Sequence, residues 1–168
     1  MFVGVASEIE WALLSYRLPR EPSTPRIAVW RKLKRLGVVQ VLDGLVAVPA
    51  GPESVERFEW IAEDVVAAGG EARVWLARIL SRGEARDLRE RLIAEVASDY
   101  GALVEEAQAA VKDDVEPDRR RTYARLKREL QRIRKRDHFP GRSFERAEAA
   151  LHALGATLDP SKVSKVRT

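Results

Sequence analysis

Apolar and polar positions divide the chain into two parts with different periodicities. Between residues 10 and 80, short apolar runs alternate with amphipathic helical stretches, and Pro, Gly or an Asp-Gly pair separates them. A period of two indicates strands, whereas apolar positions three and four residues apart indicate helices. After Ser81 only the helical periodicity remains. The pattern therefore predicts a mixed first part and an all-helical second part.

The first part predicts the order strand, helix, strand, strand, helix, strand. Its first strand is apolar on both faces, which is typical of a central strand. Asp43-Gly44 lies between two apolar runs and predicts a tight hairpin. We expect strands at 10–18, 38–42, 45–48 and 71–80, and helices from a Ser23 or Thr24 cap to Gly37 and from Glu53 to Ala68. This order predicts an α+β fold, with a ferredoxin-like βαββαβ domain over residues 8–80.

The second part, residues 81–158, predicts a helical extension. An apolar seam continues for about six turns through Leu88, Leu92, Val96, Tyr100, Leu103, Ala107 and Val111. A break at 116–118 precedes a basic helix at 118–137, and Ser143 is expected to cap a last helix that ends at Gly155. Residues 159–168 are expected to form a mobile basic tail, and residues before the first strand an irregular lead-in.

Composition excludes several classes of site. The chain has no cysteine and only two histidines, His138 and His152, so thiolate chemistry is absent and we expect no cofactor and no metal site. No apolar run approaches the roughly 20 residues that span a bilayer, and the N-terminal residues lack the pattern of a signal peptide. We therefore expect a cytoplasmic protein without membrane contact, and no catalytic residues.

Positive charge is concentrated in one predicted helix. The net charge is +4, and residues 1–80 contribute nothing to it, with 10 basic and 10 acidic side chains. Between Arg119 and Arg136, ten residues are Lys or Arg and only Glu129 is acidic. A stripe of arginines on one helix face can follow the phosphates of DNA. The predicted DNA-binding residues of this helix are Arg120, Arg121, Arg125, Lys127, Arg128, Arg132, Arg134, Lys135 and Arg136.

Each of these features also has a structural interpretation. The stripe could be a solvated face whose arginines pair with acidic residues of the preceding helix, such as Glu90, Glu95, Glu105 and Glu106. A second basic group on the first helix, Arg31, Lys32, Lys34 and Arg35, could supplement a DNA surface or simply suit the helix dipole. Four tryptophans lie on four elements of the first part, and we expect most of them in the core: Trp11, Trp30, Trp60 and Trp75.

The residues also carry a family resemblance. The runs WALLSYRLPREPSTPRIAVWRKLKRLG and RTYARLKRELQRIRKRDHFPG are similar to the N-terminal domain of the chromate resistance regulator ChrB, over most of residues 10–155. The resemblance implies a cytoplasmic, DNA-binding regulator of chromate efflux operons. Such regulators usually continue into a sensing domain, so a separate sensory protein is an expected partner, beside duplex DNA and a second copy in a homodimer.

The same unit resembles two further groups, the phenylacetate repressor PaaX and the small CRISPR-associated metal-dependent nucleases. Those nucleases carry an aspartate after an aromatic residue at the end of the first strand, where this chain has Tyr16-Arg17. A cation at the place of a Mg²⁺ ligand argues against nuclease chemistry. We therefore predict a non-catalytic DNA-binding regulator. The alternatives are a protein-interaction module for a sensory domain and, less favoured, a nuclease.

Overall fold

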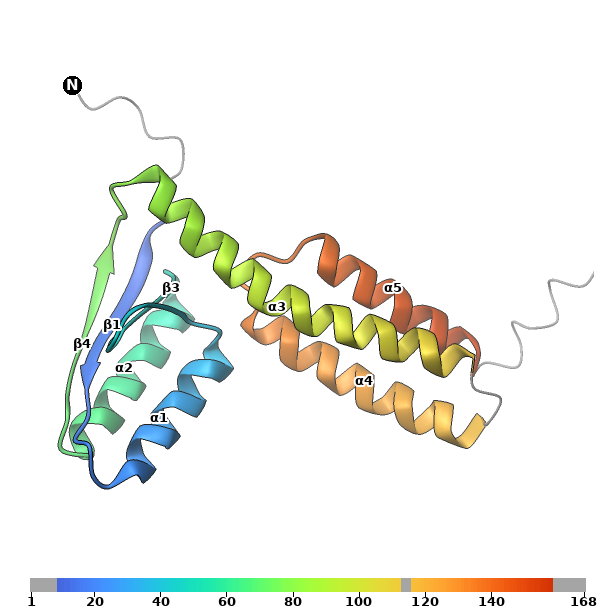
Figure 1. Ribbon diagram of the computed structural model, residues 1–168, viewed down its shortest axis with the longest axis horizontal. Helices are drawn as coiled ribbons and strands as arrows, with labels where there is room; N and C mark the ends of the chain where they lie inside the picture. The colour runs from blue at the N-terminus through green and yellow to red at the C-terminus, as the bar shows by residue number, and fades with distance from the viewer. Residues whose placement is uncertain (1–8, 113–115, 159–168) are drawn as a thin grey trace, which may run out of the picture. The chain divides into compact units, whose positions relative to one another are not determined.

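The computed structural model describes residues 9–112 and 116–158 (Figure 1). It contains two compact units, one up to Leu92 and one from Ile93 onward. The expected lead-in before the first strand, the break near residues 113–115 and the basic tail at 159–168 lie outside the described residues. The element order of the first unit and the α+β class agree with the sequence prediction.

The first unit is a four-stranded antiparallel sheet with two helices on one face. The strands are β1 (Trp11–Arg17), β2 (Val39–Leu42), β3 (Leu45–Pro49) and β4 (Glu71–Ala77), in the sheet order β2-β3-β1-β4. The helices are α1 (Ser23–Leu36) and α2 (Pro52–Ala67). β1 pairs with β3 and β4, which confirms the central position predicted from its two apolar faces.

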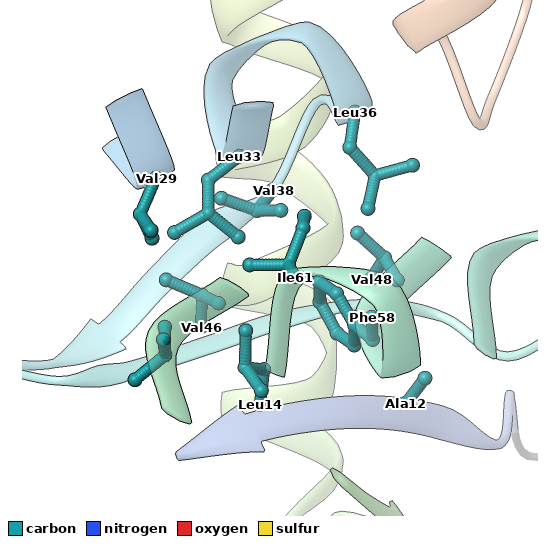
Figure 2. Close-up of a cluster of buried hydrophobic side chains, with 11 residues drawn as sticks. Ala12, Leu14, Val29, Leu33, Leu36, Val38, Val46, Val48, Phe58 and Ile61 are labelled. Carbon is teal, nitrogen blue, oxygen red and sulfur yellow. The ribbon is translucent and has the colours of Figure 1, made fainter. Parts of the chain in front are cut away.

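The main core of this unit lies between the sheet and the two helices. Ala12 and Leu14 of β1 and Val46 and Val48 of β3 point toward α1 and α2, where they meet Phe58 and other buried side chains (Figure 2). Alternate residues of each strand therefore contribute to this core, as the period of two requires.

The opposite face of the sheet is partly covered by the next helix. Trp11, Val39 and Ala47 are buried there. Leu88 of the long helix α3 (Arg82–Val111) is also buried, and Arg91 donates a hydrogen bond of 2.6 Å to the carbonyl of Gln40. The first turns of α3 therefore lie against this face.

The second unit contains the rest of α3, α4 (Glu116–Arg136) and α5 (Arg142–Ala156). These helices share one core that includes Tyr100, Leu126, Ile133 and Leu154. The predicted apolar seam of α3 is buried from Leu88 to Ala107, whereas Val111 at its end is 37% exposed.

The expected packing of the tryptophans is wrong. Trp11 is 1% exposed, but Trp30, Trp60 and Trp75 are 38%, 58% and 50% exposed. Each amphipathic helix buries a single face, which smaller residues fill. Trp60 lies about 200° around α2 from the buried Phe58, because each helical residue turns by about 100°. Trp30, Trp60 and Trp75 therefore contribute to the surface, and only Trp11 of the four is buried as expected.

Several predicted ends also differ from the structure. α1 begins at Ser23, with Pro22 at the N-cap, so neither Ser23 nor Thr24 caps it with a side-chain hydrogen bond. α5 has Gly141 at its N-cap instead of Ser143. β4 ends at Ala77, before the predicted end of that strand. The predicted end of α1 at Gly37 is confirmed, because Gly37 is the C-cap residue and has a left-handed φ of 73°.

The hairpin turn gives a testable prediction about stability. Gly44 has a φ of +72°, its carbonyl accepts a 2.7 Å hydrogen bond from the Tyr16 amide, and an added Cβ would lie 2.5 Å from the Tyr16 carbonyl oxygen. We expect Gly44→Ala to lower the free energy of unfolding by about 1–3 kcal/mol, measured by urea titration. Gly51→Ala is the control, because Gly51 has a φ of −167° and its Cβ would meet only Ser54 Oγ at 3.7 Å. Equal effects of both substitutions would contradict the prediction.

Candidate nucleic-acid interface

α4 separates an apolar side from a basic side. Leu126, Leu130 and Ile133 recur at steps of four and three residues and are buried against the neighbouring helices. The cations occupy the remaining circumference of the helix, and Arg134, Lys135 and Arg136 lie in its last turn, where they also suit the helix dipole. The local sequence therefore determines which side of α4 faces solvent.

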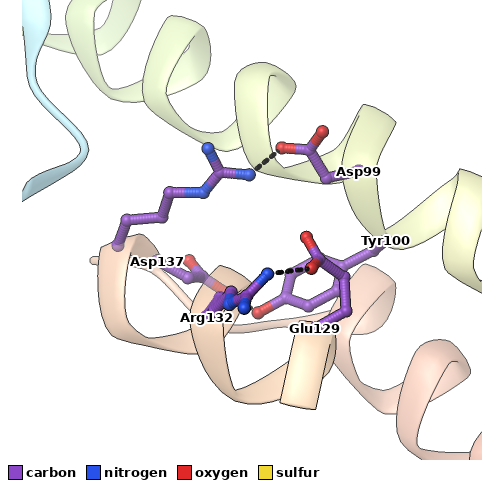
Figure 3. A network of polar contacts seen from close by, with 6 residues as sticks. Asp99, Tyr100, Glu129, Arg132 and Asp137 are labelled. Carbon is purple, nitrogen blue, oxygen red and sulfur yellow. Dashed lines mark hydrogen bonds and ion pairs between the residues drawn. The ribbon is translucent and has the colours of Figure 1, made fainter. Parts of the chain in front are cut away.

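The predicted arginine stripe is largely engaged with carboxylates. Arg125 pairs with Glu106 of α3, and Arg136 pairs with Asp99 of α3. Figure 3 shows Asp99 in its ion pair and the contact between Arg132 and Glu129. Glu106 is among the acidic residues that the sequence suggests as partners, whereas Asp99 is not. The structural interpretation of the stripe therefore holds for part of it.

These ion pairs differ in how firmly they hold the arginine. Arg121 pairs with Asp118 at 3.6 Å and Arg132 with Glu129 at 3.2 Å, within the same helix, and both arginine side chains are at least 75% exposed. Exposed pairs of this kind contribute about 0–1 kcal/mol, so a phosphate can replace the carboxylate at little cost. Arg136 is only 26% exposed, and its pair joins two helices. We therefore expect Arg136 to hold the helices together rather than to contact a ligand.

Three of the predicted cations of α4 remain available for a ligand. Lys127, Arg128 and Lys135 are exposed, and they form no ion pair with another residue in the described part of the chain. Arg128 and Lys135 are seven residues apart, which is close to two helical turns, so they lie on one face about 10 Å apart along the axis. Arg120 is exposed but has a partner, and Arg134 donates to the carbonyl of Asp137 at 3.1 Å.

A buried polar group closes the end of α4. Asp137 is 6% exposed; it accepts hydrogen bonds of 3.0 Å from the Tyr100 hydroxyl and from the Phe139 amide. The Tyr100 ring packs edge-on against Phe144, with ring centroids 5.9 Å apart. Figure 3 shows Tyr100 and Asp137 side by side. No sequence signal points to this group, because Tyr100 and Asp137 are 37 residues apart.

Burial raises the pKa of Tyr100, and its hydrogen bond to Asp137 raises it further. The folded state thus holds the tyrosine proton more tightly than the unfolded state, whose Tyr pKa is near 10.0. The stability that this difference provides is complete below pH 10 and is lost as the pH rises toward the folded-state pKa. We expect the unfolding free energy of the helical unit to fall above pH 10, and to fall less steeply in Tyr100→Phe. Urea titrations followed by circular dichroism at several pH values would test this, and parallel pH profiles would contradict it.

The comparisons with known proteins cover both sets of predicted cations. The family described as Protein ChrB, N-terminal, matches residues 26–162. The chain belongs to this family. A curated relative, Protein ChrB of Cupriavidus metallidurans, is 28% identical over 155 residues, which are 90% of this chain and 47% of the relative. The chain spans about half the length of that ChrB protein. No solved structure matches the chain.

The ChrB family match includes α1 as well as α4, and the α1 cations lie in the first unit. Lys32 pairs with Asp64 of α2, and Lys34 lies 5.2 Å from the ring centroid of Trp30. Arg31 and Arg35 are exposed. Two of the four predicted residues in α1 are therefore engaged within the unit, which favours a structural role for Lys32.

The position that a nuclease would use for its metal is occupied differently in this ChrB-family chain. Arg17 at the end of β1 is exposed and pairs with Glu71 of β4 at 3.2 Å. Within residues 9–112 and 116–158, no three His, Asp or Glu side chains are grouped closely enough to hold a metal ion. None of the helices in these ranges is long and apolar enough to cross a membrane.

Proposed function

We propose that the chain is a non-catalytic, DNA-binding transcriptional regulator of the ChrB type that controls a chromate-resistance operon in the cytoplasm. The observation that carries the proposal is the family membership, combined with a solvent-facing row of cations on α4 that no carboxylate of the described residues neutralises. The DNA duplex would contact Lys127, Arg128 and Lys135 first. Arg121 and Arg132 would join after leaving their exposed carboxylate partners.

The charge pattern favours backbone contacts over base readout. Lys127, Arg128 and Lys135 project from a helix that has one acidic residue, Glu129, between Arg119 and Arg136. Lysine and arginine at such positions bind phosphates and release counterions, so affinity falls steeply with salt. Contacts to phosphates set the position of a protein on DNA, whereas base contacts set its sequence preference. We assign α4 the positioning role and assign no residue to base readout.

The test is fluorescence anisotropy of a labelled duplex taken from upstream of the gene for this chain. The duplex is titrated with the purified chain over a range of salt concentrations, and an unrelated duplex of equal length serves as control. We expect binding that weakens linearly in a plot of log affinity against log salt, and that is tighter on the upstream duplex. Equal, weak binding to both duplexes at low salt would overturn the proposal.

A second candidate function, a module that binds a sensory protein domain, is favoured by one observation. Trp60 is 58% exposed and lines a groove between α1 and α2 with Lys32, Arg35, Arg57 and Asp64. Lys32 pairs with Asp64 and Arg57 pairs with Glu53, whereas Arg35 is exposed. Exposed aromatic rings and arginines are enriched at protein–protein interfaces, so Trp60 beside Arg35 suits a protein partner. Titrating the chain with the part of the C. metallidurans ChrB protein that it does not match would test this. Complex formation that Trp60→Ala abolishes would support the second function.

A further inference from the structure

The outer edge of β4 lacks the short length, the proline and the bulge that often protect an edge strand. β4 is seven residues long, contains no proline, and pairs with β1 in continuous register. β2, at the other edge of the sheet, has four residues, a register shift after Gln40 and a hydrogen bond from Arg91. Short length and bulges discourage pairing with another chain. Within residues 9–112 and 116–158, no strand pairs with the outer edge of β4.

Apolar side chains are exposed on both sides of this edge. Trp75 is 50% exposed on the sheet face opposite α1 and α2, and Leu76 is 59% exposed on the helix-covered face. Val66 of α2 is 58% exposed as well. Asp64 faces α1 through its pair with Lys32, and Val66 lies two residues later, about 200° around the helix. Val66 therefore lies on the flank of α2 away from α1, and α2 packs over β4 and β1.

We propose that β4 pairs antiparallel with β4 of a second copy of the chain, centred on Val74, so that the two sheets form one continuous sheet. This register pairs the whole strand, whereas any other symmetric register leaves residues of β4 unpaired. It places Arg73 opposite the partner's Trp75 on one face. On the other face it places Ala72 opposite the partner's Leu76, so that the exposed Leu76 is covered.

The sequence of β4 is complementary to itself in this register. Side chains directly opposite across an antiparallel pair are in contact, and a guanidinium over an indole ring is a favourable cation–π arrangement. The two-fold symmetry forms that Arg–Trp contact twice. Glu71 faces Ala77, and Arg78 faces Gly70, so no two like charges are opposed. This complementarity favours a second copy over an unrelated peptide, and it does not depend on DNA binding.

The natural absence of cysteine provides a direct test. In Val74→Cys the two new cysteines face each other, with Cα atoms about 4.5–5.5 Å apart across an antiparallel pair, within the range that a disulfide spans. In Leu76→Cys each cysteine faces the partner's Ala72, and the two cysteines of the dimer lie about 14 Å apart. Leu76 is the more exposed position, so random collision would favour cross-linking of the control variant.

We expect sedimentation equilibrium of the unmodified chain to show a dimer that dissociates on dilution, and mild oxidation to cross-link Val74→Cys at least about tenfold faster than Leu76→Cys. A chain that stays monomeric at all concentrations would overturn the proposal. Equal cross-linking of the two variants would overturn it too, because the dimer would then use another surface.

A charge exchange checks the register without a covalent bond. Trp75→Arg places an arginine opposite the partner's Arg73 twice, so we expect the dimer to dissociate. Adding Arg73→Glu to Trp75→Arg places a carboxylate opposite the partner's arginine and should restore the dimer. Circular dichroism would establish that both variants are folded. A folded double variant that stays monomeric would contradict the register.

Discussion

We expect tight binding to the upstream duplex to be abolished when the charge of the three available cations of α4 is reversed. The variant is Lys127→Glu/Arg128→Glu/Lys135→Glu. These side chains are exposed and have no carboxylate partner in the described structure, so their loss should not disturb the packing of the helices. Each lost phosphate contact lowers the slope of log affinity against log salt by about 0.9, so the slope should fall by about 2.7. Affinity at low salt should fall on the order of a thousandfold. Fluorescence anisotropy measures both quantities.

The control variant carries the same change in net charge at other places. Arg20, Arg78 and Arg82 are exposed and lie outside α4. Arg20→Glu/Arg78→Glu/Arg82→Glu should keep most of the affinity and the slope. If both triple variants lost affinity equally, net charge rather than α4 would determine binding.

Arg125 and Arg136 are poor positions for such a test, although they belong to the same predicted stripe. A glutamate at either place would face a carboxylate of α3, Glu106 or Asp99. Loss of binding in these variants would then follow from disturbed helix packing as well as from lost phosphate contacts. The choice of residues for the first prediction therefore depends on the ion pairs that the structure shows.

Replacing Asp137 by alanine is expected to be the most destabilising polar substitution in the helical unit. The change leaves the Tyr100 hydroxyl, on a residue 1% exposed, without its acceptor, and removes the acceptor of the Phe139 amide. An unsatisfied buried polar group costs about 1–3 kcal/mol, so we expect a total loss of about 3 kcal/mol. Asp137→Asn keeps one acceptor oxygen and should lose about half as much.

The distribution of aromatic residues allows the two units to be followed separately. All four tryptophans lie in the first unit, so tryptophan fluorescence reports the sheet unit, whereas circular dichroism reports all helices. We expect Asp137→Ala to lower the midpoint of the circular dichroism transition. A transition unchanged from that of the unmodified chain would contradict the role assigned to Asp137.

The order of elements could be predicted because it depends on local signals. Asp43-Gly44 between two apolar runs permits a tight turn, and Gly37 ends α1 with a left-handed φ. The periods of two and 3.6 residues follow from backbone geometry alone. The predicted N-caps of α1 and α5 were wrong. A hydroxyl side chain near the start of a helix does not decide which residue takes the N-cap conformation.

The candidate site could be predicted only as far as the position of its cations on one helix. Spacing along α4 shows that Arg125 and Arg128 lie near one another on the helix surface, but it does not show what faces each of them. Arg125 meets Glu106, and Arg128 meets no carboxylate in the described residues. The partner of Arg136, Asp99, is 37 residues away, and no sequence spacing connects them.

The sequence by itself determined the βαββαβ order, the three helices that follow, and the concentration of positive charge in α4. It could do so because each of these depends on residues close together in the chain. Only the tertiary structure decided which cations have a carboxylate partner among the described residues, that Asp137 and Tyr100 meet in the core, and that three tryptophans lie at the surface. These outcomes depend on contacts between residues far apart in the chain, and on how much of each helix its neighbours cover. Local periodicity carries no information about either.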